Sequence, residues 1–230
     1  TMTGSGTAAS ANVANGIAMS NNGNLALADG TGAASNYSLN STVINITKRV
    51  LNSSGSKTYD ANTNALAGAI TLSNLVSGEA LNHSGTATIS SANAGSYTIS
   101  NLSGISIADG SGGAASNYTL TGGTHNFTVN RRPLNATLSR QYDGTTAAAG
   151  STLSAFDALQ GGETLTLSGS GTAANDNVAN GISVSSLGTL ALVNGTGAAS
   201  NYSLNSAVIN ITKRVLNSSG SKIYDANTNA

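Results

Sequence analysis

The sequence repeats itself at a distance of 165 residues. Residues 1–65 and 166–230 align without a gap and differ at only 13 of 65 positions. A weaker copy lies between them, because the string Asn-Tyr-Ser/Thr-Leu that begins at Asn36 recurs at Asn117 and at Asn201. The basic period is therefore about 82 residues, and alternate copies are more alike than neighbours. A period of this length predicts a tandem array in which each copy is one structural unit.

Each copy ends at a pair of basic residues that follows a strand-like run. The only basic pairs in the chain are Lys48-Arg49, Arg131-Arg132 and Lys213-Arg214. We interpret them as the seams between copies. The sequence then contains two complete repeat units, 48–130 and 131–212, together with the C-terminal part of a unit at 1–47 and the N-terminal part of another at 213–230.

Charged residues make up only 8% of the chain, against about 25% in a typical soluble domain. Nine basic and nine acidic residues cancel, so no field attracts nucleic acid. There is no cysteine, which excludes disulfides, thiolate nucleophiles and cysteine-based metal sites. No run approaches the 18 or so consecutive apolar residues of a membrane span, so we expect no membrane insertion. The polarity comes from Ser, Thr and Asn, which suits an exposed extracellular protein.

The hydrophobic pattern within a copy has a period of two. Leu134, Ala136 and Leu138 alternate with polar residues, and Gly and Asn separate successive short runs of this kind. We predict an all-β fold, built from small antiparallel β domains that are sandwich-like or β-grasp-like. Residues 68–76 and 151–159 are ambiguous between one short helix and a loop. A continuous parallel β-helix is the alternative, although no shorter period within a copy supports it.

A second string, Tyr-Asp, follows a cation by two residues in each copy. In a strand the cation and the tyrosine would share one face, and the aspartate would point to the other. We therefore expect the tyrosine ring to cover a small core, with the cation extending past it to solvent, and the aspartate to open a turn. The structural anchors predicted from the two repeated strings are Tyr37, Tyr59, Asp60, Tyr118, Tyr142, Asp143, Tyr202, Tyr224 and Asp225. On this interpretation Tyr142→Ala unfolds its unit.

The sequence offers no convergent set of catalytic partners around these strings, so we predict no enzyme activity and no cofactor. Glycine-rich clusters around Asp29 and Asp109 resemble calcium loops, but each has one carboxylate, and the third copy has Asn194. Hairpin loops are favoured over metal sites.

Residues 131–212 contain R-x-YDGTT-A, then a GGE turn, then G-x-G-x-x-x-NY-x-L before a last strand. This order resembles the YDG and related MBG-type repeat domains of large bacterial secreted adhesins, especially filamentous-haemagglutinin-like exoproteins of two-partner secretion systems. The resemblance covers essentially the whole chain, with Ala61 and Ala226 in place of Gly144. It implies small, mostly-β domains strung together as a surface stalk, and it supplies no catalytic residues.

We therefore expect an extracellular stalk segment of a bacterial cell-surface or secreted adhesin, acting as a structural spacer in adhesion or a biofilm matrix. Its partners would be neighbouring repeat units. Two alternatives stay open: a filament subunit that pairs with other copies through its incomplete terminal units, and a module that binds host or matrix glycans. Because the two similar copies differ most between 10–29 and 175–194, a ligand would first be sought there.

Overall fold

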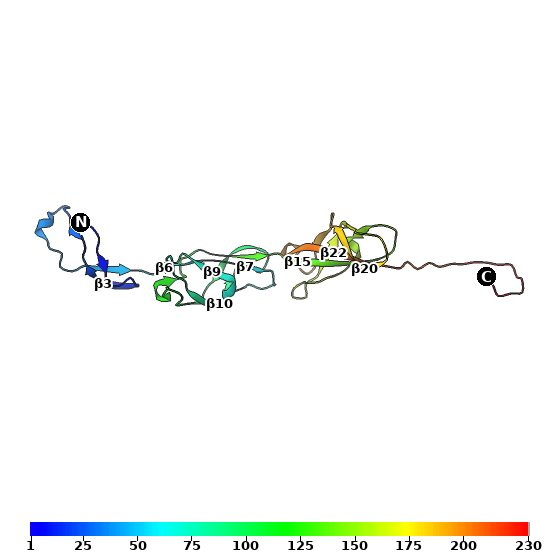
Figure 1. The fold of residues 1–230 in the computed structure, drawn as a ribbon, viewed down its shortest axis with the longest axis horizontal. Coiled ribbons are helices and arrows are strands. Elements are labelled where there is room, and N and C mark those ends of the chain that lie inside the picture. Colours follow the sequence, from blue (N-terminus) through cyan, green and yellow to red (C-terminus); the bar gives the residue numbers. More distant parts are fainter. Residues whose placement is uncertain (230) are drawn as a thin grey trace. The chain divides into compact units, whose positions relative to one another are not determined.

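The computed structural model describes residues 1–229, which are built from short β-strands and three-residue 3-10 turns (Figure 1). They form two compact units. Unit 1 consists of Thr1–Lys57, Thr63–Ser91 and Ser96–Thr128, and unit 2 consists of Thr58–Asn62, Ala92–Gly95 and the residues from Val129 onward. The predicted mostly-β fold with small tandem domains is confirmed.

Two long parallel strands organise unit 2. Strand β15 (Arg132–Gln141) pairs with β22 (Tyr202–Thr212), from Arg132 beside Tyr202 to Gln141 beside Thr212. The sheet runs in the order β16-β19-β20-β22-β15-β17, and β18 pairs separately with β21. The remaining strands are β16 (Ala147–Ala149), β17 (Leu153–Phe156), β18 (Leu165–Ser168), β19 (Ser170–Ala173), β20 (Ala179–Ser186) and β21 (Ala191–Asn194).

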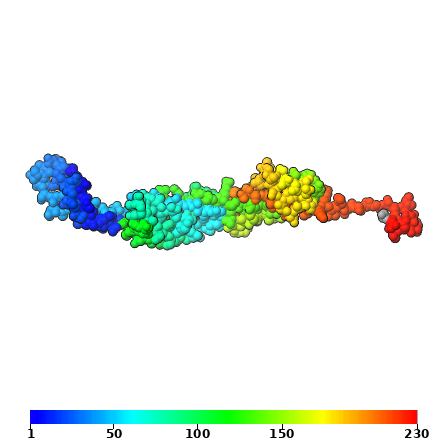
Figure 2. Space-filling view, viewed as in Figure 1, coloured from blue at the N-terminus to red at the C-terminus, as the bar shows by residue number. Residues whose placement is uncertain are grey.

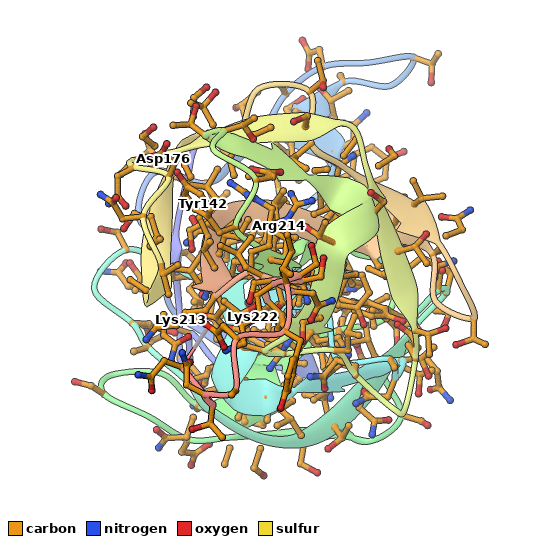
Figure 3. All side chains as sticks on the ribbon, turned by 90° about the vertical axis from the view of Figure 1, so that its right-hand side faces the viewer. Tyr142, Asp176, Lys213, Arg214 and Lys222 are labelled. Atoms are coloured by element: carbon orange, nitrogen blue, oxygen red, sulfur yellow. The ribbon has the colours of Figure 1, made fainter. Side chains whose placement is uncertain are left out.

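The chain beyond β22 lies apart from this sheet. Residues 213–229 contain no strand and are exposed, and Figure 2 shows them as a narrow string of atoms. Figure 3 gives the side chains at this end of unit 2 and labels Tyr142, Asp176, Lys213, Arg214 and Lys222.

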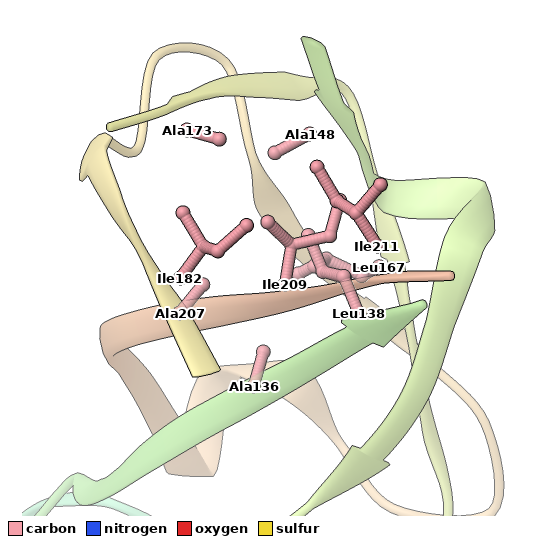
Figure 4. Packing of buried hydrophobic residues seen from close by; sticks show 9 residues of the cluster. All are labelled: Ala136, Leu138, Ala148, Leu167, Ala173, Ile182, Ala207, Ile209 and Ile211. Carbon is pink, nitrogen blue, oxygen red and sulfur yellow. The ribbon is translucent and has the colours of Figure 1, made fainter. Parts of the chain in front are cut away.

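The core of unit 2 lies on one face of the parallel pair. Leu138 and Ile209 are fully buried, and Ala136 and Ile211 are 1% exposed, as the period of two in the sequence requires. Small alanines between the branched side chains let the surrounding strands approach closely. The nine residues of this cluster, drawn in Figure 4, are Ala136, Leu138, Ala148, Leu167, Ala173, Ile182, Ala207, Ile209 and Ile211.

Unit 1 contains a comparable sheet in the order β12-β10-β11-β14-β7-β9, with β8 paired to β10. Its strands are β7 (Asn52–Thr58), β8 (Asn64–Leu66), β9 (Ile70–Ser73), β10 (Asn82–Ile89), β11 (Gly95–Asn101), β12 (Ile105–Ala108) and β14 (His125–Asn130). Strand β6 (Arg49–Val50) pairs in parallel with β13 (Tyr118–Thr119).

The first residues of the chain form smaller sheets in unit 1. One has the order β2-β3-β5, and the other pairs β1 with β4. The bounds are β1 (Met2–Thr3), β2 (Thr7–Ala8), β3 (Ala14–Asn21), β4 (Ala26–Leu27) and β5 (Val43–Ile46). Strand β5 therefore lies at the edge of a three-stranded sheet.

Two details differ from the sequence prediction. The ambiguous segments are neither an α-helix nor a loop: a 3-10 turn at Ala67–Ala69 or Gly150–Thr152 leads directly into β9 or β17. The other difference is that the central pair β15 and β22 is parallel. The six strands β16 to β21 lie between them in the chain and form the long connection that a parallel pair requires. Most other pairs are antiparallel, and the described residues contain no parallel β-helix. None of the helices in residues 1–229 has the length and hydropathy of a membrane span.

The turn after each Tyr-Asp string adopts a left-handed conformation whether or not it holds glycine. The φ angle is 77° at Gly144 and 61° at both Ala61 and Ala226.

We expect Ala61→Gly to raise the free energy of unfolding by about 1 kcal/mol and Gly144→Ala to lower it by a similar amount. A Cβ at Gly144 would meet only the Tyr142 hydroxyl, at 3.9 Å. The substitution therefore tests the backbone strain of the left-handed conformation and not a steric clash. Urea unfolding of both variants measures this, and effects of the same sign would contradict it.

Candidate functional site

A single carboxylate in unit 2 binds two tyrosine hydroxyls. Tyr59 donates to Oε1 of Glu163 at 2.6 Å, and Tyr202 donates to Oε2 at 2.5 Å. The two rings meet edge to face, with centroids 5.3 Å apart and planes at 77°. Tyr59 is 3% exposed and Tyr202 is 1% exposed. Glu163 therefore joins two rings that come from distant parts of the sequence.

The backbone around this carboxylate is held as well. The Tyr202 hydroxyl accepts the Gln160 N–H at 3.1 Å. Arg132 donates from Nε to the Ala158 carbonyl at 2.9 Å and from Nη1 to the Tyr59 carbonyl at 3.2 Å. Both the ring and the main chain of Tyr59 are thus fixed to the sheet of unit 2.

Asn201 binds the short segment Ala92–Gly95, which also belongs to unit 2. It is 1% exposed, and its Oδ1 accepts the Ala94 N–H at 2.8 Å while its Nδ2 donates to Oδ1 of Asn93 at 3.0 Å. Both ends of a buried amide are satisfied, which makes the contact specific in geometry. We call Arg132, Glu163, Asn201 and Tyr202 the docking site of unit 2.

The docking site favours neutral phenols. Burial, and then the hydrogen bond to Glu163, raise the pKa of Tyr59 to about 12 from an ordinary value of 10.0. Burial also raises the pKa of Tyr202. A folded-state pKa above the unfolded value means that the stabilisation is complete below pH 10 and is lost as the pH rises toward 12.

This shift predicts an alkaline instability of unit 2. The free energy of unfolding should fall between about pH 10 and pH 12, more steeply in the parent chain than in Tyr59→Phe, which has one phenol fewer to ionise. Hydrogen exchange of β22 amides, corrected for the intrinsic exchange rate at each pH, would measure the slope. Identical slopes in the two proteins would show that Tyr59 does not titrate as described.

Unit 1 contains the corresponding contacts of one glutamate, one tyrosine and one asparagine. Tyr118 donates to Oε2 of Glu79 at 2.5 Å and accepts the Val76 N–H at 3.1 Å. The bond to Glu79 is the main cause that raises the pKa of Tyr118. Asn117 accepts the Val13 N–H at 2.9 Å and donates to Oδ1 of Asn12 at 2.9 Å. Two units thus use one arrangement of Glu, Tyr and Asn.

A family model for the YDG domain matches residues 46–125 and 130–209, which together are more than half of the chain. The chain belongs to the YDG domain family. No curated protein and no solved structure matches it. Each YDG copy contains one Glu-Tyr pair, 39 residues apart in both copies. The predicted boundaries at residues 48, 131 and 213 stay a prediction.

The compact units do not coincide with the YDG copies. By sequence, Thr58–Asn62 and Ala92–Gly95 lie within the first YDG match, whereas in the structure both segments belong to unit 2. Tyr59 and Asn93 provide the side-chain contacts that place them there. A tyrosine of one YDG copy is therefore part of the core that surrounds the glutamate of the next copy.

The tyrosines predicted as anchors fall into two classes. Tyr59, Tyr118 and Tyr202 are buried, whereas Tyr37, Tyr142 and Tyr224 are 69%, 39% and 89% exposed. Tyr142 does not cover the core of its own copy, which corrects the expectation that Tyr142→Ala unfolds it. The physical reason is visible at Tyr59, its equivalent in the first copy, whose ring packs on Glu163 and Tyr202 rather than on its own copy.

The three aspartates of the Tyr-Asp strings accept backbone N–H groups two residues on. The acceptor distances are 3.2 Å for Asp60 from Asn62, 3.0 Å for Asp143 from Thr145 and 3.1 Å for Asp225 from Asn227. Arg140 and Lys222 pair with the aspartates of their own copies. The Thr145 hydrogen bonds lower the pKa of Asp143, and the Lys222 hydrogen bond lowers that of Asp225.

The seam residues have unequal roles. Arg132 belongs to the docking site, and its equivalent Arg49 donates to the Asn74 carbonyl at 2.6 Å and to the Asn74 side chain at 3.0 Å. The other four seam residues lie at exposed positions: Lys48, Arg131, Lys213 and Arg214. In the pairs Lys48-Arg49 and Arg131-Arg132, the second residue therefore makes the side-chain hydrogen bonds.

The glycine-rich loops cap their own turns. Asp29 accepts the Ala34 N–H at 2.7 Å, and Asn194 accepts the Ala199 N–H at 2.8 Å. Asp109 makes the same contact with Ala115 at 2.7 Å. Since the asparagine makes the same bond as the aspartates, these loops use the side-chain oxygen and do not require its charge.

Sequence reasoning missed Glu79 and Glu163 as partners of the tyrosines. The signal was present, because they are the only glutamates in the chain and each precedes the tyrosine of an Asn-Tyr string by 39 residues. The contacts of Asn117, which is partly buried, and of Asn201, which is buried, were also missed. In a chain so rich in asparagine, no local pattern distinguishes these two.

Proposed function

We propose that this chain is a repetitive stalk segment of a bacterial cell-surface or secreted adhesin, acting as a structural spacer. One observation supports this most: Tyr59 and Asn93 of the first YDG copy are built into the compact unit of the second. A spacer must transmit load from copy to copy. Shared packing between consecutive copies serves that purpose better than a bare linker would.

The chemistry of the docking site also suits an exposed stalk. Its contacts are hydrogen bonds: the phenols donate to the Glu163 carboxylate, the Asn201 amide bonds to Asn93 and Ala94, and the Arg132 guanidinium donates to backbone carbonyls. None of these contacts is an ion pair between surface charges. Such contacts are little screened by salt. We expect the stability of unit 2 to change by less than about 0.5 kcal/mol between low and physiological ionic strength. Urea unfolding at the two salt concentrations checks this, and a strong salt dependence would contradict it.

Two measurements in the producing cell test the spacer proposal. Protease treatment of intact cells should release the chain, as expected for an extracellular location. Deleting 131–212 from the gene should shorten the distance between the cell surface and an epitope distal to the deletion, with ligand binding by the distal part unchanged. A chain found only inside the cell would refute the proposal. Loss of adhesion together with glycan binding by the isolated chain would favour the binding-module alternative.

A further inference from the structure

Two tyrosine rings of unit 2 are held close together by one carboxylate. The hydroxyls of Tyr59 and Tyr202 donate to the two oxygens of Glu163, at 2.6 Å and 2.5 Å, and the ring centroids are 5.3 Å apart. In a tyrosyl radical, the unpaired electron is shared between the phenol oxygen and the two ring carbons next to the C–O bond. Because one carboxylate holds both hydroxyls, these reactive carbons of the two rings lie near one another.

Glu163 is placed to accept the proton that a phenol releases when it is oxidised. Removal of one electron makes the phenol proton strongly acidic, so the hydrogen bond to the carboxylate becomes the path along which the proton leaves. Tyr59 and Tyr202 are buried, whereas Glu163 is half-buried. The carboxylate can therefore take up the proton of one phenol, pass it to water and accept the proton of the other.

Burial decides which partner a radical on either ring can reach. Tyr142 is 39% exposed, so a radical there meets the rings of other molecules. Tyr59 and Tyr202 are 3% and 1% exposed, and their edge-to-face contact makes each ring the neighbour of the other. A radical formed at both rings would therefore couple within the molecule.

We propose that Tyr59 and Tyr202 are joined as a dityrosine crosslink by a one-electron oxidant, such as a ruthenium(III) complex or the radicals that a peroxidase generates from hydrogen peroxide. Each phenol gives one electron to the oxidant and its proton to Glu163. A carbon–carbon bond forms between one carbon beside the C–O bond in each ring. The hydrogen on each of these carbons then moves to the phenol oxygen, which restores both aromatic rings. The protein loses two hydrogen atoms, and the oxidant takes up two electrons.

The crosslink would join consecutive YDG copies covalently, since Tyr59 lies in the match at 46–125 and Tyr202 in the match at 130–209. Its biological use rests on the proposed function, because an extracellular stalk meets both oxidants and mechanical load. The hydrogen bonds of the docking site break when unit 2 opens, whereas a carbon–carbon bond would keep Tyr59 attached to the first residue of β22.

Mass spectrometry of the oxidised monomer tests the crosslink. The dilute parent chain would be oxidised with light-activated ruthenium tris-bipyridine and persulfate, separated from oligomers by size exclusion and digested. Fragment spectra should identify a peptide pair joined through Tyr59 and Tyr202, lighter by two hydrogen atoms than the separate peptides. This pair should be absent from Tyr59→Phe. Tyr142→Phe is the matched control, because Tyr142 has the equivalent place in the next Tyr-Asp string, and it should give the parent yield. An oxidised parent monomer that lacks the pair would overturn the proposal.

The variant Glu163→Gln tests the part of the carboxylate in the reaction. The amide still offers an oxygen to a tyrosine hydroxyl but takes up no proton, so the initial rate of dityrosine fluorescence in the monomer should fall about tenfold or more. A rate equal to that of the parent would overturn the role of Glu163 as proton acceptor. Failure of the crosslink would leave the stalk proposal standing, because that proposal depends on where the chain is located in the cell.

Discussion

Replacing Tyr59 with alanine should lower the free energy of unfolding of unit 2 by about 3 kcal/mol, as expected for deletion of a buried aromatic ring. The variant loses the edge-to-face contact with Tyr202 and the hydrogen bond to Glu163. Tyr142→Ala, at the equivalent position of the next copy, should cost less than about 1 kcal/mol because its side chain is exposed.

Hydrogen exchange of the β15 and β22 amides measures the stability of unit 2 separately from that of unit 1. Protection of both strands should fall by about two orders of magnitude in Tyr59→Ala and change little in Tyr142→Ala. Equal losses in the two variants would mean that the tyrosine of each copy stabilises its own copy, as the sequence first suggested.

Ile209→Ala should lower the stability of unit 2 by about 3 to 4 kcal/mol, because the side chain is fully buried in the nine-residue cluster and leaves a cavity. The chain offers a matched control at Ile44, the equivalent residue of β5, which is 43% exposed. Ile44→Ala should cost less than about 1 kcal/mol, because the side chain is partly exposed.

Urea unfolding of both isoleucine variants at low protein concentration measures the difference. A large loss in Ile44→Ala would contradict the exposure of this side chain, which is 43%.

The strands were the part of the fold that the sequence could predict. Leu134, Ala136 and Leu138 alternate with polar residues, and all three are buried on one face of β15. The direction of the partner strand was not predictable, because the same alternation serves parallel and antiparallel neighbours. The 3-10 turn at Gly150–Thr152 was hidden for another reason: three residues are too few to show a helical period.

The candidate site was predictable only in its residue types. Tyr59 and Tyr142 occupy the same string, yet one is buried and the other exposed. Period and spacing describe one copy at a time, so they cannot show that a side chain packs on the following copy. The paired glutamates could have been found from their constant spacing to Tyr118 and Tyr202, whereas the contact of Glu163 with Tyr59 required the structure.

A double-mutant cycle between Tyr59→Phe and Glu163→Ala tests the central claim most directly, namely that one YDG copy is fastened to the next through this hydrogen bond. The stability of unit 2 would be measured by hydrogen exchange in the parent, both single variants and the double variant. The account predicts a coupling energy of at least about 1 kcal/mol, because the Phe substitution costs little once the carboxylate is gone. Losses that add to within about 0.3 kcal/mol would show that the two residues act independently and would contradict it.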